Sequence, residues 1–240
     1  MTKRLIVFQH GPWDRMGRLL TAAAHKTQTQ LDIIEVWRQP IPKLTPYDAM
    51  IVLDGSLNVN QEQQYPFLRI EKKAILDSIR EDRPYLGFCL GHQLLAEAMG
   101  AKIEDNATVS LGVIRGYLTH DGRRHQIFKG FEKTIPLFKW HTQTICEPLP
   151  KTIQILTTSA DCPVEAISVL DRPHLIGLQF DNHAADPADV AERISKDERW
   201  LGTLNNGKIN PAVILDHIQR YHQTLRDDFE RLFTNFLKCT

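Results

Sequence analysis

Short apolar segments alternate with helical patterns through the first hundred residues of the chain. The segments are rich in β-branched and aromatic side chains, which is typical of buried parallel strands, and they lie at 5–8, 31–37, 50–53 and 85–89. Apolar positions at helical spacing follow at 13–24 and 65–80, and again after the last segment. This alternation predicts an α/β fold with an open, doubly wound, mostly parallel sheet, whose ligands bind at the carboxyl ends of the strands.

The pattern changes to short strands and turns between residues 101 and 180. Turn signals such as Asp121-Gly122 separate the apolar stretches. Strands are predicted at 111–119, 152–158, 164–169 and 175–180. We interpret this part of the chain as an antiparallel addition to the same domain.

The chain from residue 186 onward is predicted to be helical. Asp186-Pro187 and Asn210-Pro211 each place a capping side chain before a first-turn proline. The second helix carries an apolar stripe from Ile214 through Tyr221 to Phe236, which favours packing on the domain over binding a partner. The expected organisation is an α/β domain followed by a C-terminal helical extension packed on it, at residues 1–185 and 186–240.

Composition excludes several classes of function. The 240 residues contain 29 Lys and Arg against 29 Asp and Glu with no basic block, so no nucleic-acid partner is expected. The four cysteines and ten histidines show no metal-ligand spacing, and the chain has no Walker or dinucleotide loop, so we expect no metal and no cofactor. The apolar runs are too short for a signal peptide or a membrane span, which predicts a cytoplasmic protein.

One segment carries candidate chemistry. Gly87-Phe88-Cys89-Leu90-Gly91 joins a predicted strand to a predicted helix, in the pattern of a nucleophile elbow with cysteine as the nucleophile. The positive end of the helix would favour the thiolate form of Cys89. The alternative is a buried cysteine in an ordinary strand–helix turn. Polar Gln93, one turn into the helix, favours the elbow.

Motifs in a fixed order then carry a family resemblance. They are Gln9-His10-Gly11-Pro12-Trp13, Asp54-Gly55, Tyr65-Pro66-Phe67-Leu68, residues 87–100, Trp140-His141 and Gly177-Leu178-Gln179-Phe180. With these motifs the chain, from about residue 5 to 190, resembles the class I glutamine amidotransferases, in the stand-alone group similar to the amidotransferase part of GMP synthase. The resemblance implies the flavodoxin-like fold of that family.

The resemblance also implies a reaction. Members hydrolyse the side-chain amide of glutamine and pass ammonia to a synthase domain or subunit. Cys89 would form a γ-glutamyl thioester, and a histidine held by an acidic residue would transfer the protons. Backbone N–H groups of Gly55 and Leu90 would stabilise the oxyanion. Gln93 would line the glutamine pocket, and Trp140 and His141 would contact the amino-acid end of the substrate. Because the chain lacks an ATP loop, the synthase partner would act in trans.

The chain departs from the family pattern at the base. Where the family has His-x-Glu, this chain has Asp181-Asn182-His183, so the candidate acid and base are exchanged. In an extended segment both side chains would face the cleft, with Asp181 beside Cys89 and His183 about 6 to 7 Å further along. A carboxylate beside the thiol would also raise the pKa of Cys89.

The chain departs from the family pattern at two further positions. Asp54 replaces a glycine at the oxyanion loop, and Gln143 replaces the acid that would hold the substrate ammonium.

Three functions are compatible with these residues. The retained elbow favours a working glutaminase in which His183, or else His141, reaches Cys89. The alternatives are an impaired homologue that binds a ligand or partner, and a cysteine hydrolase of another γ-glutamyl or amide substrate. His10 either borders the cleft or is an ordinary loop histidine.

Overall fold

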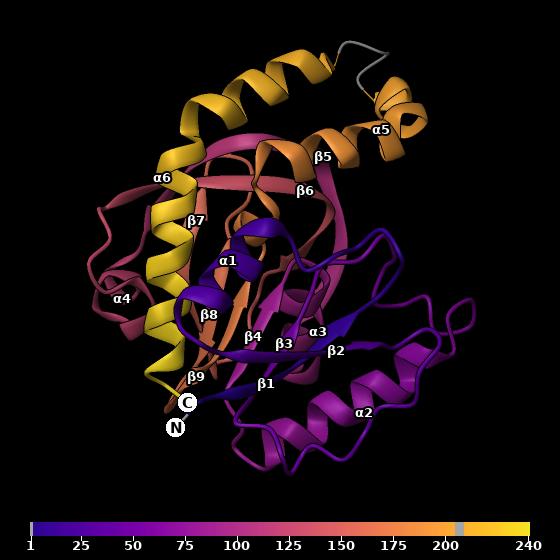
Figure 1. Cartoon of the computed structure of the whole chain (residues 1–240), viewed down its shortest axis with the longest axis vertical. Coiled ribbons are helices and arrows are strands. Elements are labelled where there is room, and N and C mark those ends of the chain that lie inside the picture. Colours follow the sequence, from indigo (N-terminus) through magenta and orange to yellow (C-terminus); the bar gives the residue numbers. More distant parts are fainter. Residues whose placement is uncertain (1, 205–208) are drawn as a thin grey trace.

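The computed structural model describes residues 2–204 and 209–240, and these form a nine-stranded mixed sheet with helices on both faces (Figure 1). The strand order is β2-β1-β3-β4-β9-β8-β7-β5-β6. The parallel part consists of β1 (Arg4–Gln9), β2 (Gln30–Glu35), β3 (Ala49–Val52), β4 (Tyr85–Phe88) and β9 (Arg172–Leu178). The antiparallel part continues from β9 through β8 (Ala166–Val169), β7 (Ile153–Ser159), β5 (Lys102–Leu118) and β6 (Thr134–Cys146).

Alternate side chains of the central strands separate two apolar layers. Leu5 and Val7 pack with α1 (Arg18–Lys26) and α6 (Pro211–Leu237), which cover one face of the sheet. Ile6 and Phe8 pack on the other face, which is covered by α2 (Phe67–Arg80) and α3 (Leu90–Ala98). The remaining helical segments are α4 (His120–Arg124), η1 (Gln126–Phe128), η2 (Asn182–Ala184) and α5 (Pro187–Thr203).

The predicted α/β fold, with its parallel core, antiparallel addition and C-terminal helices, is confirmed, but one strand pairs differently than expected and one strand was missed. The strand expected at 175–180 is β9, which pairs with β4 in parallel. Strand β6 was not predicted, because its apolar and polar positions do not alternate cleanly. It nevertheless pairs along almost its whole length with β5 and forms the edge of the antiparallel part of the sheet.

Both C-terminal helices begin at the predicted caps. The side chains of Asp186 and Asn210 accept hydrogen bonds from the N–H groups of Ala188 and Ala212 over 2.9 and 3.0 Å. The stripe of α6 lies against the sheet, but Tyr221 does not belong to it, since it is 42% exposed. Burial of this long apolar stripe stabilises the packing of α6 on the domain.

The start of α1 also differs from the expectation. The sequence pattern predicts a helix from residue 13, but α1 begins only at Arg18. Gly17 has a φ of 81°, which a helix excludes, and Trp13 is 67% exposed. Residues 10–17 therefore form a loop at the carboxyl end of β1 and border the site described below.

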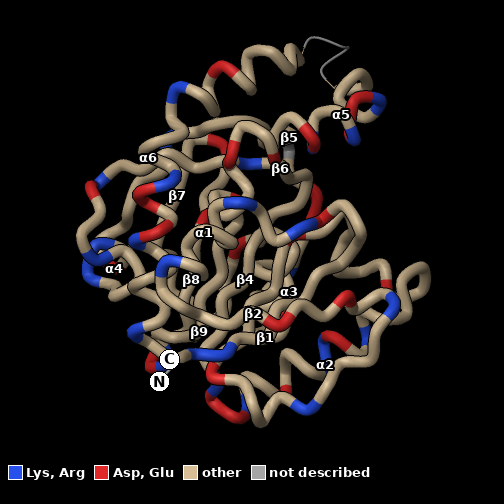
Figure 2. The backbone as a smooth tube through the Cα atoms, viewed as in Figure 1, with Lys and Arg blue, Asp and Glu red and all other residues tan. Residues whose placement is uncertain are grey.

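The surface charges are mixed. Lys and Arg are interspersed with Asp and Glu along the whole chain (Figure 2). The two ends of the chain lie side by side (Figure 1), and Lys3 Nζ donates a hydrogen bond to the backbone oxygen of Thr240 over 2.7 Å. Within the described part of the chain, none of the helices combines the length and apolar character that crossing a bilayer requires.

Candidate active site

Cys89 sits at a strained turn between β4 and α3. Its φ is 43° and its ψ is −96°, a conformation that costs a non-glycine residue about 1 to 3 kcal/mol. Its N–H donates to the carbonyl of Leu178 over 2.8 Å, which holds the turn to β9. A Cβ at Gly87 would collide with the backbone of Gly91, and one at Gly91 would collide with Val52. The strand and helix therefore approach this closely only because both flanking residues are glycine.

A cavity of about 280 Å³ opens beside Cys89. Four segments line it: the loop after β3, the elbow, β6 and α5. The lining residues are Gly55, Ser56, Leu57, Asn58, Cys89, Leu90, Gln93, Trp140, His141, Thr142, Gln143, Arg193, Asp197 and Trp200. The structure thus gathers Cys89 with the predicted oxyanion and substrate-binding residues around one space. It adds three residues of α5 that sequence reasoning missed.

The surroundings of Cys89 favour the protonated thiol. Burial raises its pKa well above the ordinary value, and the negative charges of Asp181 and Asp54 raise it further. The guanidinium of Arg193 and the N–H of Leu90 act in the opposite direction. The one side-chain hydrogen bond to the sulfur among described residues comes from Gln179 Nε2, over 3.5 Å. The helix N-terminus alone therefore does not produce a thiolate here.

Hydrogen bonds between side-chain amides connect Cys89 to the predicted substrate-binding residues. Gln93 Nε2 donates to Gln179 Oε1 and to the carbonyl of Gln143, each over 3.2 Å. The same carbonyl lies 3.0 Å from His141 Nδ1. Burial, together with nearby Lys139, lowers the pKa of His141 to about 3, so its ring is neutral. Gln93, His141 and Gln143 are therefore held in place by one another.

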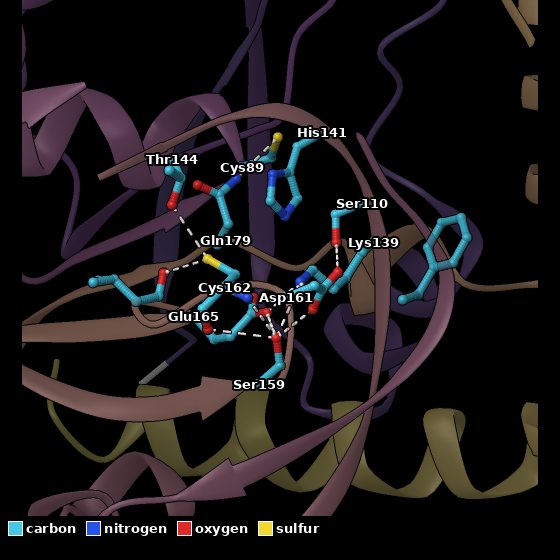
Figure 3. A network of polar contacts seen from close by, with 12 residues as sticks. Cys89, Ser110, Lys139, His141, Thr144, Ser159, Asp161, Cys162, Glu165 and Gln179 are labelled. Atoms are coloured by element: carbon cyan, nitrogen blue, oxygen red, sulfur yellow. Dashed lines mark hydrogen bonds and ion pairs between the residues drawn. The ribbon is translucent and has the colours of Figure 1, made fainter. Parts of the chain in front are cut away.

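A second polar network lies against these amides. Lys139, on β6 and fully buried, has its Nζ 2.9 Å from Asp161 Oδ1 and 3.3 Å from Ser159 Oγ, and it also contacts Glu165 (Figure 3). Its charge is thus compensated by two carboxylates. We interpret this network as support for β6, β7 and the start of β8, because it compensates a buried charge without lining the cavity.

The segment that carries Asp181 and His183 is a turn, not the extended strand that the sequence predicts. Asp181 N–H donates to the carbonyl of Phe138 over 2.7 Å, and the 3₁₀ turn η2 begins at the next residue. The side chain of Asn182 accepts from the N–H of Phe138 over 2.7 Å and donates to the carbonyl of Pro136 over 3.0 Å. The turn brings the side chains of Asp181 and His183 within 4.8 Å of one another, closer than in an extended segment.

Arg193 of α5 enters this site and links two carboxylates. Its Nη2 lies 2.6 Å from Asp54 Oδ2, and its Nη1 lies 3.1 Å from Asp181 Oδ2. Burial raises the pKa of Asp181 to about 7, and the charge of Asp54 adds to this effect. Burial opposes ionisation of Asp54 as well, but Arg193 and His183 outweigh it and hold the pKa of Asp54 below its usual range. No local motif singles out Arg193, because it lies in an ordinary amphipathic helix.

The ring of His183 packs against Phe88 and lies close to Asp54. Its ring stacks on Phe88 with centroids 4.3 Å apart, and its Nε2 lies 3.3 Å from Asp54 Oδ1. Over residues 2–204 and 209–240, neither ring nitrogen makes a hydrogen bond, and His183 makes none to Cys89. Asp54, Asp181 and His183 offer ligand atoms of the kind that bind a metal ion. Arg193 already pairs with both carboxylates, and its positive charge disfavours an added cation.

His10 contacts the loop that follows β3. It is buried, with Nδ1 2.8 Å from the carbonyl of Asp54 and Nε2 2.8 Å from Glu71 Oε1. Burial alone would lower the pKa of His10, but the carboxylate of Glu71 outweighs it and raises that pKa to about 9. The next residue, Gly55, is enclosed: a Cβ there would lie 2.7 Å from Leu90 Cδ2 and 3.1 Å from His10 Cβ. His10 is thus a buried, paired residue.

Comparisons with known proteins agree with this geometry. The family model "Glutamine amidotransferase class-I" matches residues 14–181, so the chain belongs to the class I glutamine amidotransferase family. One subunit of the glutamine-hydrolyzing GMP synthase of Methanothermobacter thermautotrophicus is 26% identical over 176 residues, which cover 73% of this chain and 86% of that one. The glutamine-hydrolyzing GMP synthase of Syntrophomonas wolfei is 39% identical over 97 residues, which cover 40% of this chain but only 18% of that longer protein.

Solved structures confirm the fold over the whole chain. A glutamine amidotransferase from Thermotoga maritima superposes with a TM-score of 0.88 at 21% identity, covering 99% of both chains. A glutamine amidotransferase from Methylobacillus flagellatus superposes with a TM-score of 0.86 at 21% identity, covering 100% of this chain and 96% of that one. At this identity the likeness concerns the fold.

Proposed function

We propose that this protein binds glutamine, or a closely related γ-glutamyl or amide molecule, in the cavity beside Cys89 and hydrolyses it slowly. The observation that carries the proposal is that the carboxylate of Asp181, held by Arg193, lies near the thiol where an amidotransferase needs an imidazole. The elbow and the cavity support binding of the amide. The raised pKa of Cys89 supports slow attack, because the thiol, not the thiolate, is the main species.

The proposed reaction begins at the amide carbon. Cys89 Sγ forms a bond to this carbon, and the carbonyl oxygen becomes an oxyanion that the N–H groups of Gly55 and Leu90 stabilise. The C–N bond then breaks, ammonia leaves with the proton that the thiol gave up, and water hydrolyses the thioester to glutamate. Asp181 Oδ1, which has no hydrogen-bond partner among the described residues, is the proton acceptor that the site offers, directly or through a water.

A second candidate is a fast glutaminase that works with a partner. It is favoured by His183, whose ring nitrogens are buried without hydrogen bonds among the described residues and which lies close to the cluster around Asp181. A rearrangement of η2, induced by ligand or by a synthase partner in trans, would have to bring His183 to Cys89. Ammonia would then pass to the synthase, and the similarity to a subunit of a glutamine-hydrolyzing GMP synthase supports this candidate.

Binding and turnover separate these possibilities. We expect the Cys89→Ser variant to bind L-glutamine in calorimetry, and the unaltered protein to release glutamate and ammonia at a low rate that Cys89→Ala abolishes. Rapid release would favour the second candidate: with the protein alone if glutamine induces the rearrangement, or only with a synthase present if the partner induces it. A protein that neither binds glutamine nor releases ammonia would contradict both. A panel of γ-glutamyl amides and small amides, assayed against Cys89→Ala, tests the related substrates.

A further inference from the structure

The cavity wall carries one carboxylate without a counter-charge. The charged side chains that line the cavity are Arg193 and Asp197, both from α5. The charge of Arg193 is compensated by Asp54 and Asp181. Asp197 Oδ2 accepts a hydrogen bond from Trp140 Nε1 over 2.8 Å, and no Lys, Arg or His of residues 2–204 and 209–240 pairs with either of its oxygens. A half-buried carboxylate in this setting favours a cation in the adjacent space.

Two indole rings flank this carboxylate. The centroids of Trp140 and Trp200 lie 6.3 Å apart at an interplanar angle of 45°, and both rings line the cavity. The guanidinium carbon of Arg193 lies 5.5 Å from the Trp140 ring centre, whereas in the described chain no cation contacts Trp200 in this way. Because an aromatic face attracts cations, Trp200 adds to the preference that Asp197 creates.

The part of the cavity wall that β6 forms carries no carboxylate among the residues that the structure describes. Gln143 stands where family members have an acid, and its Nε2 donates to Asp105 Oδ1 over 3.0 Å. Neutral His141 lies next to it on the cavity wall. A ligand with its amide at Cys89 therefore meets a carboxylate on α5 and none on the β6 side of the cavity.

We infer that Asp197, together with Trp200, binds a cationic group of the ligand, so that α5 selects an amide that carries an ammonium group. This inference rests on the proposed function, because it takes the cavity beside Cys89 as the ligand site. It assigns a specificity-determining role to a helix that lies beyond residue 181, the last residue of the family match. The ligand class is an amino-acid amide, in preference to the same amide without its ammonium group.

The test measures two ligands on matched variants by calorimetry, in the Cys89→Ser background. The ligands are L-glutamine and glutaramate, which is the same molecule without the α-ammonium group. Asp197→Asn keeps an oxygen for Trp140 Nε1 and removes only the charge. Glu198→Gln is the matched control, because it removes the same charge from the exposed neighbouring position of α5. Trp200→Leu is a second variant of the proposed site.

Asp197→Asn is expected to weaken glutamine binding by about 10- to 100-fold, the range for a lost charge-assisted hydrogen bond. Glutaramate binding should change by no more than about twofold, since the ammonium partner is missing. Trp200→Leu should weaken glutamine more than glutaramate, and Glu198→Gln should change neither. Equal effects of Asp197→Asn on both ligands, or no effect on glutamine, would overturn the inference but leave the proposed function standing. Absence of binding by both ligands would overturn the two together.

Discussion

Arg193 Nη2 donates a hydrogen bond to Asp54 Oδ2 over 2.6 Å, although 139 residues separate the two along the chain. The contact joins α5 to the loop that follows β3. It places a positive charge among two carboxylates and the Cys89 thiol, and so sets the electrostatics of the site. We therefore expect the reactivity of the thiol and the stability of the fold to depend on these charges.

Restoring the family order of base and acid should increase turnover. The double variant Asp181→His, His183→Glu places an imidazole beside Cys89 and an acid behind it. General-base catalysis contributes about 10²- to 10⁴-fold, so we expect kcat for glutamine hydrolysis to rise by at least about 100-fold. The measurement is glutamate release under saturating glutamine. Asp181→His alone should give a smaller gain, and a silent double variant would show that more than the base is missing.

Removing the charge of Arg193 should destabilise the protein. Arg193→Met leaves Asp54 and Asp181 buried without a cation, and breaking such a buried pair costs about 3 to 5 kcal/mol. Urea unfolding at pH 7 measures the loss. Lys196→Met, one turn further along α5, is the control, since the more exposed Lys196 pairs with Asp14 and should lose no more than about 1 kcal/mol. Similar losses in the two variants would contradict the buried-pair interpretation.

The charge of Asp181 should make the protein less stable as the pH rises toward neutrality. Burial, reinforced by Asp54, raises the pKa of Asp181 to about 7, above its ordinary value of 3.8, so the folded state binds the proton more tightly than the unfolded state. Stability should therefore fall between about pH 4 and pH 7 and then level off. Asp181→Asn removes this contribution. Denaturant unfolding of both proteins across this range should give a smaller decline for the variant; parallel curves would refute the assignment.

Alkylation of Cys89 should respond to its charged neighbours in opposite directions. Asp181→Asn removes a negative charge that raises the pKa of the thiol, so it should speed alkylation by iodoacetamide at pH 8. Arg193→Met removes a positive charge that lowers this pKa and should slow the reaction. One pKa unit corresponds to about a tenfold change in thiolate. Peptide mass spectrometry resolves Cys89 from Cys162, whose rate serves as the internal reference and should stay constant.

The His10–Glu71 pair should stabilise the fold most at and below neutral pH. Burial alone would lower the pKa of His10, but Glu71 outweighs it and raises that pKa from 6.5 to about 9. A raised histidine pKa contributes stability that is complete below pH 6.5 and is lost as the pH rises through about 9. Glu71→Gln should therefore cost more unfolding free energy at pH 6 than at pH 10. A loss that does not depend on pH would contradict the charged pair.

Local sequence patterns were sufficient for much of the fold and for the elbow. Continuous apolar runs indicated β1, β3 and β4 because a strand buried on both faces needs apolar side chains at successive positions. Glycines on both sides of Cys89 indicated the close approach that the structure shows. Strand β6 escaped prediction because it carries a buried lysine, Lys139, whose partners Ser159, Asp161 and Glu165 lie outside its own sequence.

By itself, then, the sequence determined the order of the strands and helices up to the elbow, the position of the cysteine and the family, because each of these depends on residues close together in the chain. The tertiary structure alone decided that residues 181–183 turn, that His183 stacks on Phe88 and that Arg193 and Asp197 reach the cavity. These outcomes depend on contacts between distant segments, whose energies local periodicity does not encode. The chemistry of Cys89 is set by those contacts.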